Sequence, residues 1–221
     1  MTRDELLTDL YDKTLTGNGP AVLDLTRQGL ADGLGPETLL YEALIPALEE
    51  VGARFERGDF FVPEMLIAGK AMAGALEILR PLLAETGAES IGTIVMGTVK
   101  GDVHDIGKNL VNIMFEGAGF QVIDLGVQVA PEKFIEAIRQ HKPDIVGFSA
   151  FLTTTMPMFK ANISALTKAG LRDEVIVMVG GAPVTQEYAD VVGADGYAAD
   201  ASAAVVKAKE LLRRRRALAS A

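Results

Sequence analysis

The sequence predicts an α/β protein in which a four-helix bundle precedes a doubly wound, five-stranded parallel sheet. Before about residue 87, apolar side chains recur at helical spacing only. From about residue 90, short β-branched runs alternate five times with helical stretches, the pattern of a parallel sheet covered by helices on both faces. We therefore expect a helical cap domain over residues 1–87 and an α/β domain over residues 91–221, joined by a linker at Gly87–Ser90.

The four helices of the first domain are predicted from four apolar stripes, which run through residues 6–11, 22–25, 39–51 and 65–79. Turn signals at 17–20, 33–36 and 58–63 separate them. Pro36 and Pro63 suit the first turn of a helix, whereas Pro46 inside the third stripe predicts a kink. Stripes joined by short connections are typical of a four-helix bundle.

The sheet is predicted from five short apolar runs at residues 93–96, 120–125, 144–148, 175–179 and 196–197. Helical stretches follow them at about 106–118, 131–141, 156–169, 184–192 and 201–216. Five such units most often take the strand order 2-1-3-4-5 of Rossmann-like, flavodoxin-like folds, in which ligands bind beyond the carboxyl ends of the strands. The loops after strands one, three and four, at 97–109, 149–155 and 180–183, are therefore expected to carry the site.

Composition excludes several classes of function. The 221 residues include 30 acidic and 21 basic side chains, which give a formal net charge of −9, and no Cys. The lack of Cys rules out disulfides, thiolate metal sites, iron–sulfur clusters and a cysteine nucleophile. An acidic chain is poorly suited to nucleic acid, no apolar run is long enough for a membrane span, and the N-terminus is too acidic for a signal peptide. We expect a cytoplasmic protein without nucleic-acid or membrane partners.

The loop after the first strand does not match the common phosphate-binding motifs. Gly101 and Gly107 enclose five residues rather than four, and Asn109 stands where a P-loop needs Ser or Thr. The dinucleotide pattern G-x-G-x-x-G is absent too. Lys108 is expected to be an ordinary solvated lysine.

The same loop carries a possible metal ligand, His104, two residues after Asp102. Neutral imidazole is a common ligand, and a carboxylate that binds its other nitrogen fixes the tautomer. With only two His in the chain, zinc would need carboxylate ligands as well. A single imidazole is enough for a metal that a macrocycle already holds. The alternative is a loop histidine that caps a turn or a helix.

The run Asp102-Val103-His104-Asp105-Ile106-Gly107 resembles the D-x-H-x-x-G signature of cobalamin-binding domains. Ser149 follows His104 by 45 residues, and Gly180-Gly181 lies about 30 residues further on. This three-part pattern is similar to the cobalamin module of methionine synthase and to the corrinoid proteins of methyltransferase systems. The helical half, with the stretch 58–65, is similar to the family's four-helix cap, so the resemblance covers essentially the whole chain.

The resemblance implies cobalamin, as methylcobalamin or a related corrinoid, bound base-off and His-on, with His104 as the axial ligand to cobalt. Asp102 and Thr155 would complete a hydrogen-bond relay to this histidine. Ser149, Gly180 and Gly181 would line a slot for the displaced nucleotide tail. The other implied cofactor-binding residues of the α/β domain are Gly101, Val103, Asp105, Ile106, Gly107, Phe151, Leu152, Thr153 and Ala182.

This chain departs from the family's pattern at two positions. The family's S-x-L motif places Leu at position 151, where this chain has Phe151, and the relay serine of methionine synthase matches Thr155. Phe55, Val62 and Met65 match cap residues that shield the upper face of the corrin, with ordinary bundle core as their alternative. The linker at Gly87–Ser90 would be the hinge of that cap.

By resemblance the chain is a methyl carrier, a corrinoid subunit rather than a complete enzyme. It would accept a methyl group on cobalt from a substrate-specific methyltransferase. A second methyltransferase would pass it to tetrahydrofolate or a thiol coenzyme, and a corrinoid reductive activator is a further partner. The alternatives are a cobalamin-dependent regulator or light sensor, a mutase small subunit and a flavodoxin-like module. Arg213–Arg216 is interpreted as charge favoured at a helix C-terminus, with a docking patch as its alternative.

Overall fold

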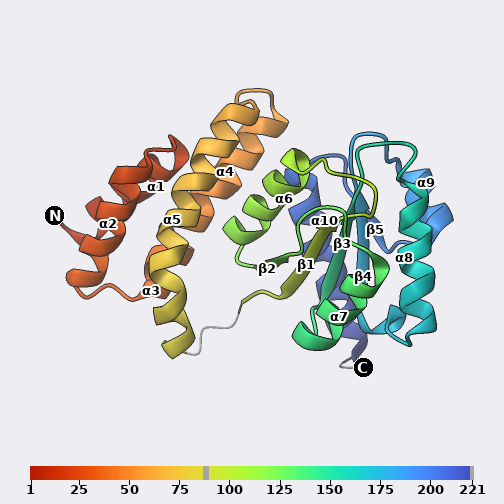
Figure 1. Ribbon diagram of the computed structural model, residues 1–221. Coiled ribbons are helices and arrows are strands. Elements are labelled where there is room, and N and C mark those ends of the chain that lie inside the picture. The colour runs from red at the N-terminus through yellow and green to blue at the C-terminus, as the bar shows by residue number, and fades with distance from the viewer. Residues whose placement is uncertain (87–89, 220–221) are drawn as a thin grey trace. The chain divides into compact units, whose positions relative to one another are not determined.

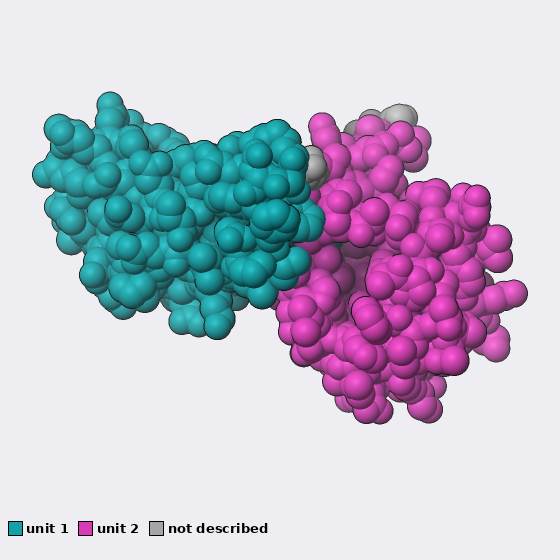
Figure 2. Space-filling view, turned by 90° about the horizontal axis from the view of Figure 1, so that it is seen from above, with its two compact units in different colours: residues 1–90, 113–119 teal, residues 91–112, 120–221 magenta. Residues whose placement is uncertain are grey.

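The chain divides into two compact units in the computed structural model, which describes residues 1–86 and 90–219. One unit comprises residues 1–90 and 113–119, and the other comprises residues 91–112 and 120–221 (Figure 2). Residues 113–119, which follow the boundary expected near residue 87, thus group with the helical unit. Residues 87–89 of the expected linker and hinge lie outside the described residues.

The helical unit follows the four apolar stripes. Its elements are α1 (Arg3–Leu15), α2 (Gly19–Ala31), α3 (Pro36–Leu39), the π-helical turn η1 (Leu40–Leu44), α4 (Ile45–Glu56) and α5 (Val62–Thr86) (Figure 1). A capping box between Thr2 and Glu5 begins α1, and the Asn18 side chain caps α2. The third stripe forms α3, η1 and α4. The π-helical turn ends at Leu44, two residues before Pro46, which has no N–H to offer the carbonyl of Glu42.

The α/β unit contains the predicted five-stranded parallel sheet. Its strands are β1 (Thr93–Thr98), β2 (Gln121–Asp124), β3 (Ile145–Ser149), β4 (Ile176–Gly180) and β5 (Gly196–Tyr197), in the order β2-β1-β3-β4-β5. The helices are α6 (Ile106–Gly117), α7 (Pro131–His141), α8 (Pro157–Lys168), α9 (Gln186–Val192) and α10 (Ala201–Ala219), with a 3-10 turn η2 (Arg172–Glu174) before β4 (Figure 1). Only the first part of α6, up to residue 112, groups with this unit. The expected fold class and strand order are confirmed.

Near the carboxyl ends of β3 and β4, the two faces of the sheet differ in side-chain size. On one face, large residues such as Val146 and Phe148 pack against Phe134 of α7 and Phe159 of α8 in a continuous core. Strand alternation points the neighbouring residues to the opposite face, where β3 and β4 carry Gly147, Ser149 and Gly180. α10 covers part of this second face, since a Cβ on Gly196 would stand 2.7 Å from Leu211 Cδ1. Small residues therefore gather toward the carboxyl ends of β3 and β4.

Guanidinium groups bind backbone carbonyls at the amino ends of the strands. Arg215 donates to the carbonyls of Asp144, before β3, and of Asp173 and Glu174, before β4. Arg216 donates to the carbonyl of Ile91 before β1 at 2.8 Å. These bonds give the Arg213–Arg216 run a structural role in holding α10 to the edge of the sheet opposite the loops expected to bind a ligand.

Candidate functional site

The loop after β1 is held in place by its own backbone. Gly101 adopts a φ of +86°, a conformation that favours glycine, and the N–H of Asp102 donates to the carbonyl of Val99 at 3.1 Å. The hydroxyl of Thr98, the last residue of β1, donates to the carbonyl of His104 at 3.0 Å. The end of β1 thus fixes the path of the loop on both sides of Asp102.

Asp102 and His104 form a directed pair. Asp102 is completely buried, and its Oδ1 accepts the backbone N–H of His104 at 3.0 Å and lies 2.7 Å from Nδ1 of the ring. An ionised carboxylate can only accept, so Nδ1 carries the hydrogen and Nε2 is the nitrogen available to a metal. The His104 side chain is 44% exposed, which leaves the ring accessible to a ligand.

The second carboxylate oxygen connects this pair to the loop after β3. Asp102 Oδ2 accepts the Thr155 hydroxyl at 2.7 Å and the N–H groups of Phe151 and Leu152 at 2.8 and 3.2 Å. Burial raises the pKa of this carboxyl, but the hydrogen bonds from Thr155, His104 and Phe151 outweigh burial and hold the pKa well below its usual range. The structure therefore brings His104, Asp102 and Thr155 together in one hydrogen-bonded chain.

The loops after β3 and β4 approach each other closely. Thr98, Ser149 and Gly180 lie in one row across β1, β3 and β4. Gly181 has a φ of +133°, and a Cβ added there would stand 1.9 Å from the carbonyl oxygen of Ala150. A Cβ on Gly180 would meet nothing closer than 3.9 Å. Only glycine fits at position 181, whereas a Cβ at position 180, beside Ser149, would make only an ordinary contact with the Ala198 carbonyl.

Apolar side chains stand exposed around His104. Val103 is 57% exposed, Ile106 71%, Phe151 52% and Leu152 38%. Val103, Phe151 and Leu152 come from the two loops that Asp102 links, and Ile106 begins α6. The Phe151 ring stacks on the His104 ring. Large apolar groups gathered on a surface in this way mark a binding site for a ligand with apolar area of its own.

The remaining predicted residues are distributed differently. Asp105 accepts the Asn109 amide at 3.1 Å, and Gly107 lies in the first turn of α6. Thr153 and Ala182 are exposed in the loops after β3 and β4. Phe55, Val62 and Met65 belong to the helical unit, where Met65 is fully buried, as the bundle-core alternative predicts. Their role toward a ligand stays a prediction.

Two parts of the site were not anticipated from the sequence. Lys108 was expected to be solvated, but its side chain is 1% exposed and its ammonium group binds Asp124 at the end of β2. The loop after β2 also reaches the site, because the N–H of Gln128 donates to the carbonyl of Asp102 at 3.0 Å. Gln128 has a φ of +55°, which is uncommon for a residue other than glycine.

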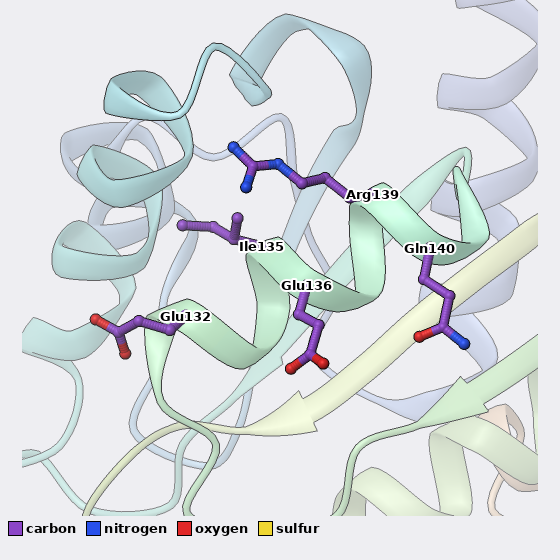
Figure 3. A pocket seen from close by; sticks show the side chains of 5 residues that line it. All are labelled: Glu132, Ile135, Glu136, Arg139 and Gln140. Carbon is purple, nitrogen blue, oxygen red and sulfur yellow. The ribbon is translucent and has the colours of Figure 1, made fainter.

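Other features lie away from this arrangement. A hollow on α7 is lined by Glu132, Ile135, Glu136, Arg139 and Gln140 and includes none of the predicted site residues (Figure 3). Within residues 1–86 and 90–219, no three His, Cys, Asp or Glu side chains are grouped so that they could hold a metal ion. In the same part of the chain, every helix is too short or too polar to cross a membrane.

Comparison with known families decides the affiliation. Residues 92–206 match the B12 binding domain, and residues 6–80 match a further family that is also described as a B12 binding domain. The first match covers more than half of the chain and contains Asp102, His104 and Thr155. The chain belongs to the B12-binding family. A corrinoid is therefore its cofactor.

Relatives of this B12-binding chain share nearly its full length. It is 44% identical to dimethylamine corrinoid protein 1 of Methanosarcina acetivorans over 213 residues, which are 96% of this chain and 100% of that protein. A chain of the methanol:cobalamin methyltransferase complex of Methanosarcina barkeri superposes with a TM-score of 0.84 and 28% identity, covering 96% of this chain and 81% of that one. A cobalamin-binding protein of Desulfitobacterium hafniense gives 0.74 and 28%, covering 94% and 97%.

The residues of this B12-binding chain fit a corrinoid on three observations. His104 offers one imidazole nitrogen, which would suit a metal that a macrocycle already holds. Exposed apolar side chains surround that imidazole. Ser149 and Gly180 are small residues side by side on one face of the sheet, and a Cβ at position 180 would meet nothing closer than 3.9 Å. On these observations, His104 is the one side chain of the site that would bind the metal.

Proposed function

We propose that this chain is the corrinoid methyl carrier of a methylamine methyltransferase system. It accepts a methyl group from a methyltransferase specific for a methylated amine and delivers it to a second methyltransferase, whose acceptor is tetrahydrofolate or a thiol coenzyme. Relatives named dimethylamine corrinoid proteins, matched over 96% of the chain, support the amine. The likeness to a chain of a methanol:cobalamin methyltransferase complex supports a partner of the methyltransferase class.

The observation that carries the proposal is the hydrogen-bonded chain from Thr155 through Asp102 to His104. We infer that His104 Nε2 is the lower ligand of cobalt in a base-off, His-on arrangement. Asp102 donates no hydrogen, so it holds the imidazole in the tautomer with a free Nε2 lone pair. Thr155 keeps the carboxylate in place and offsets part of the cost of burying its charge.

When bound, the corrinoid supplies a cobalt atom that takes up a methyl group and gives it away again. The chain's residues bind and orient it. Val103 and Ile106 offer apolar contact beside the imidazole, and Ser149 and Gly180 leave room for the nucleotide tail. In the helical unit, Phe55 and Val62 are the proposed residues that exclude water from the upper face, with Met65 as a buried support.

The first experiment tests ligation with hydroxocobalamin. The protein is mixed with an excess, desalted, and its visible spectrum is compared with those of His104→Ala and His141→Ala. The wild type and His141→Ala are expected to retain corrin absorption with base-off, His-on features. His104→Ala is expected to bind less and to lose those features. An unchanged spectrum in His104→Ala would refute axial ligation by His104, and a loss in His141→Ala instead would assign the ligand to His141, the only other histidine.

The second experiment tests the carrier role. The cobalamin-loaded protein is reduced and incubated with methylamine methyltransferases and mono-, di- or trimethylamine. Methylation of the cobalt is followed by absorbance. We expect methylation with dimethylamine and its methyltransferase, and demethylation when an acceptor and the second methyltransferase are added. Retained cobalamin without methylation by any of the three amines would contradict the amine assignment and leave the regulatory alternative.

A further inference from the structure

Phe151 covers one face of the His104 imidazole. The two ring centroids lie 4.5 Å apart with an interplanar angle of 29°, a stacked geometry. The Phe151 side chain is nevertheless 52% exposed, so it is not part of the core of the α/β unit. An aromatic ring that remains at a surface while stacked on a functional histidine calls for an explanation from the site itself.

One carboxylate fixes both rings. Asp102 Oδ1 accepts from Nδ1 of the imidazole at 2.7 Å, while Oδ2 accepts from the backbone N–H of Phe151 at 2.8 Å. The two stacked rings therefore belong to residues that are both hydrogen-bonded to the same Asp102 carboxylate. Because Asp102 is completely buried and also binds Thr155, neither connection can shift without the other.

The two contacts restrain different motions of the imidazole. The hydrogen bond to Nδ1 fixes where that nitrogen lies in the ring plane, but it allows the ring to tilt about the bond. A flat ring packed against its face opposes this tilt, because tilting would open the stack to water. Together they hold the direction of Nε2, and preorganising a ligand in this way lowers the entropy lost when it binds.

We propose that Phe151 is a positioning residue for the axial imidazole, which raises the His104-ligated share of the bound corrinoid. The inference rests on the proposed role of His104 and adds a residue that acts through it. The backbone N–H of residue 151 serves Asp102 whatever its side chain, so only the aromatic face is specific to Phe151. Leu at this position keeps an apolar side chain but cannot stack.

The first test uses the protein without cofactor. The chain has only two histidines, and His141 at the end of α7 is exposed, which makes it an internal reference. At one fixed pH, NMR is expected to show contacts between the ring protons of His104 and Phe151. The His104 ring protons should move downfield in Phe151→Leu, while those of His141 stay unchanged. Wild-type spectra without such contacts would overturn the inference, and this arm needs no variant to fold.

The second test uses the full chain loaded with hydroxocobalamin and reduced by one electron. The protein carries 15N-labelled histidine, so that an axial imidazole splits the EPR lines in two, whereas the cofactor's own base splits them in three. The two-line nitrogen splitting then gives the share of bound cofactor that is ligated by imidazole. Phe151→Leu is expected to raise the ratio of unligated to ligated cofactor roughly two- to tenfold, the effect of an aromatic pair. Phe151→Tyr keeps a flat ring and should restore the wild-type ratio. A structural role alone would lower retention without changing this ratio.

The outcomes separate the two proposals. If Phe151→Leu has the wild-type ratio while His104→Ala loses the nitrogen splitting, the role of Phe151 is wrong and axial ligation by His104 stands. If Phe151→Tyr behaves like Phe151→Leu, stacking is not the cause, and the inference is again overturned. If the wild-type spectrum itself lacks the splitting, the proposed ligation by His104 fails, and the inference fails with it.

Discussion

The ammonium nitrogen of Lys108 lies 2.7 and 2.6 Å from the two carboxylate oxygens of Asp124, although the lysine side chain is almost fully buried. This ion pair connects the first turn of α6, which follows His104, to the end of β2. Lys108 also donates to the Asn109 side chain at 2.8 Å, and Asn109 in turn donates to Asp105. A second polar network thus supports the loop that carries His104. It is attached after His104 in the sequence, whereas Asp102 is attached before it.

Lys108→Met is expected to lower the free energy of unfolding by about 2 kcal/mol. Removing one partner of a buried pair costs about 3–5 kcal/mol, and the value here is smaller because Asp124 is 38% exposed and regains water. Urea unfolding of the cofactor-free protein measures it. Lys133→Met, which breaks the exposed pair with Glu136, is the control and should cost less than about 0.5 kcal/mol. Equal effects would contradict the special role of Lys108.

Thr155→Val should destabilise the protein by about 2 kcal/mol, because it leaves the buried Asp102 carboxylate without its hydroxyl donor. Thr155→Ser keeps the hydroxyl and loses one buried methyl group. Its cost in unfolding free energy is expected to lie within about 0.5 kcal/mol of the cost of removing such a methyl group alone. The spectrum with hydroxocobalamin should lose part of its His-on character in the Val variant only. Similar losses in both variants would show that the hydroxyl is not what holds the carboxylate.

Gly181→Ala is expected to cost about 3 kcal/mol, from a disfavoured backbone conformation and a clash with the carbonyl of Ala150. Retention of cobalamin after desalting should fall as the loops after β3 and β4 separate. Gly193→Ala is a matched control, since Gly193 has a φ of +79° with no atom within 4 Å of an added Cβ, and should cost about 1 kcal/mol. Full retention by Gly181→Ala would argue against close loop approach as a condition of binding.

Asp102 predicts a specific pH dependence of stability. Its pKa is lower in the folded than in the unfolded chain, so its ionised form stabilises the fold above the unfolded pKa of about 3.9. That contribution is lost as the pH falls toward the folded pKa. The difference in unfolding free energy between the wild type and Asp102→Asn should therefore shrink below about pH 4. A difference that grows on acidification would contradict the assignment of the low pKa to the folded state.

Much of the fold could be predicted because its signals are local. The β-branched runs and their helical partners gave β1 to β5 in the correct order, and the strand order then indicated the loops that meet in the structure. Pro46 predicted a disturbed helix, and a π-helical turn precedes it, since a proline signals a missing N–H but not how the preceding turn adjusts.

What could not be predicted depends on distant partners. Lys108 and Asp124 are 16 residues apart, and only the placement of α6 beside β2 makes the lysine a buried partner rather than a solvated one. Gln128 contacts Asp102 through its backbone N–H, and because any residue but proline could make this bond, the sequence does not reveal it. Phe151 was visible as a departure from the family motif, but its stacking on His104 required the loop geometry that Asp102 imposes.

The carboxyl and amino ends of the strands have different roles in this fold. The loop after β1, at the carboxyl edge, carries the histidine, while Arg215 and Arg216 bind carbonyls before β1, β3 and β4 and so hold these strand starts to the final helix. A protease that trimmed the chain to before Arg215 would thus loosen the sheet from its far side, without touching any group beside His104. Damage to the last helix would be detected as lost cofactor even though the binding chemistry itself was intact.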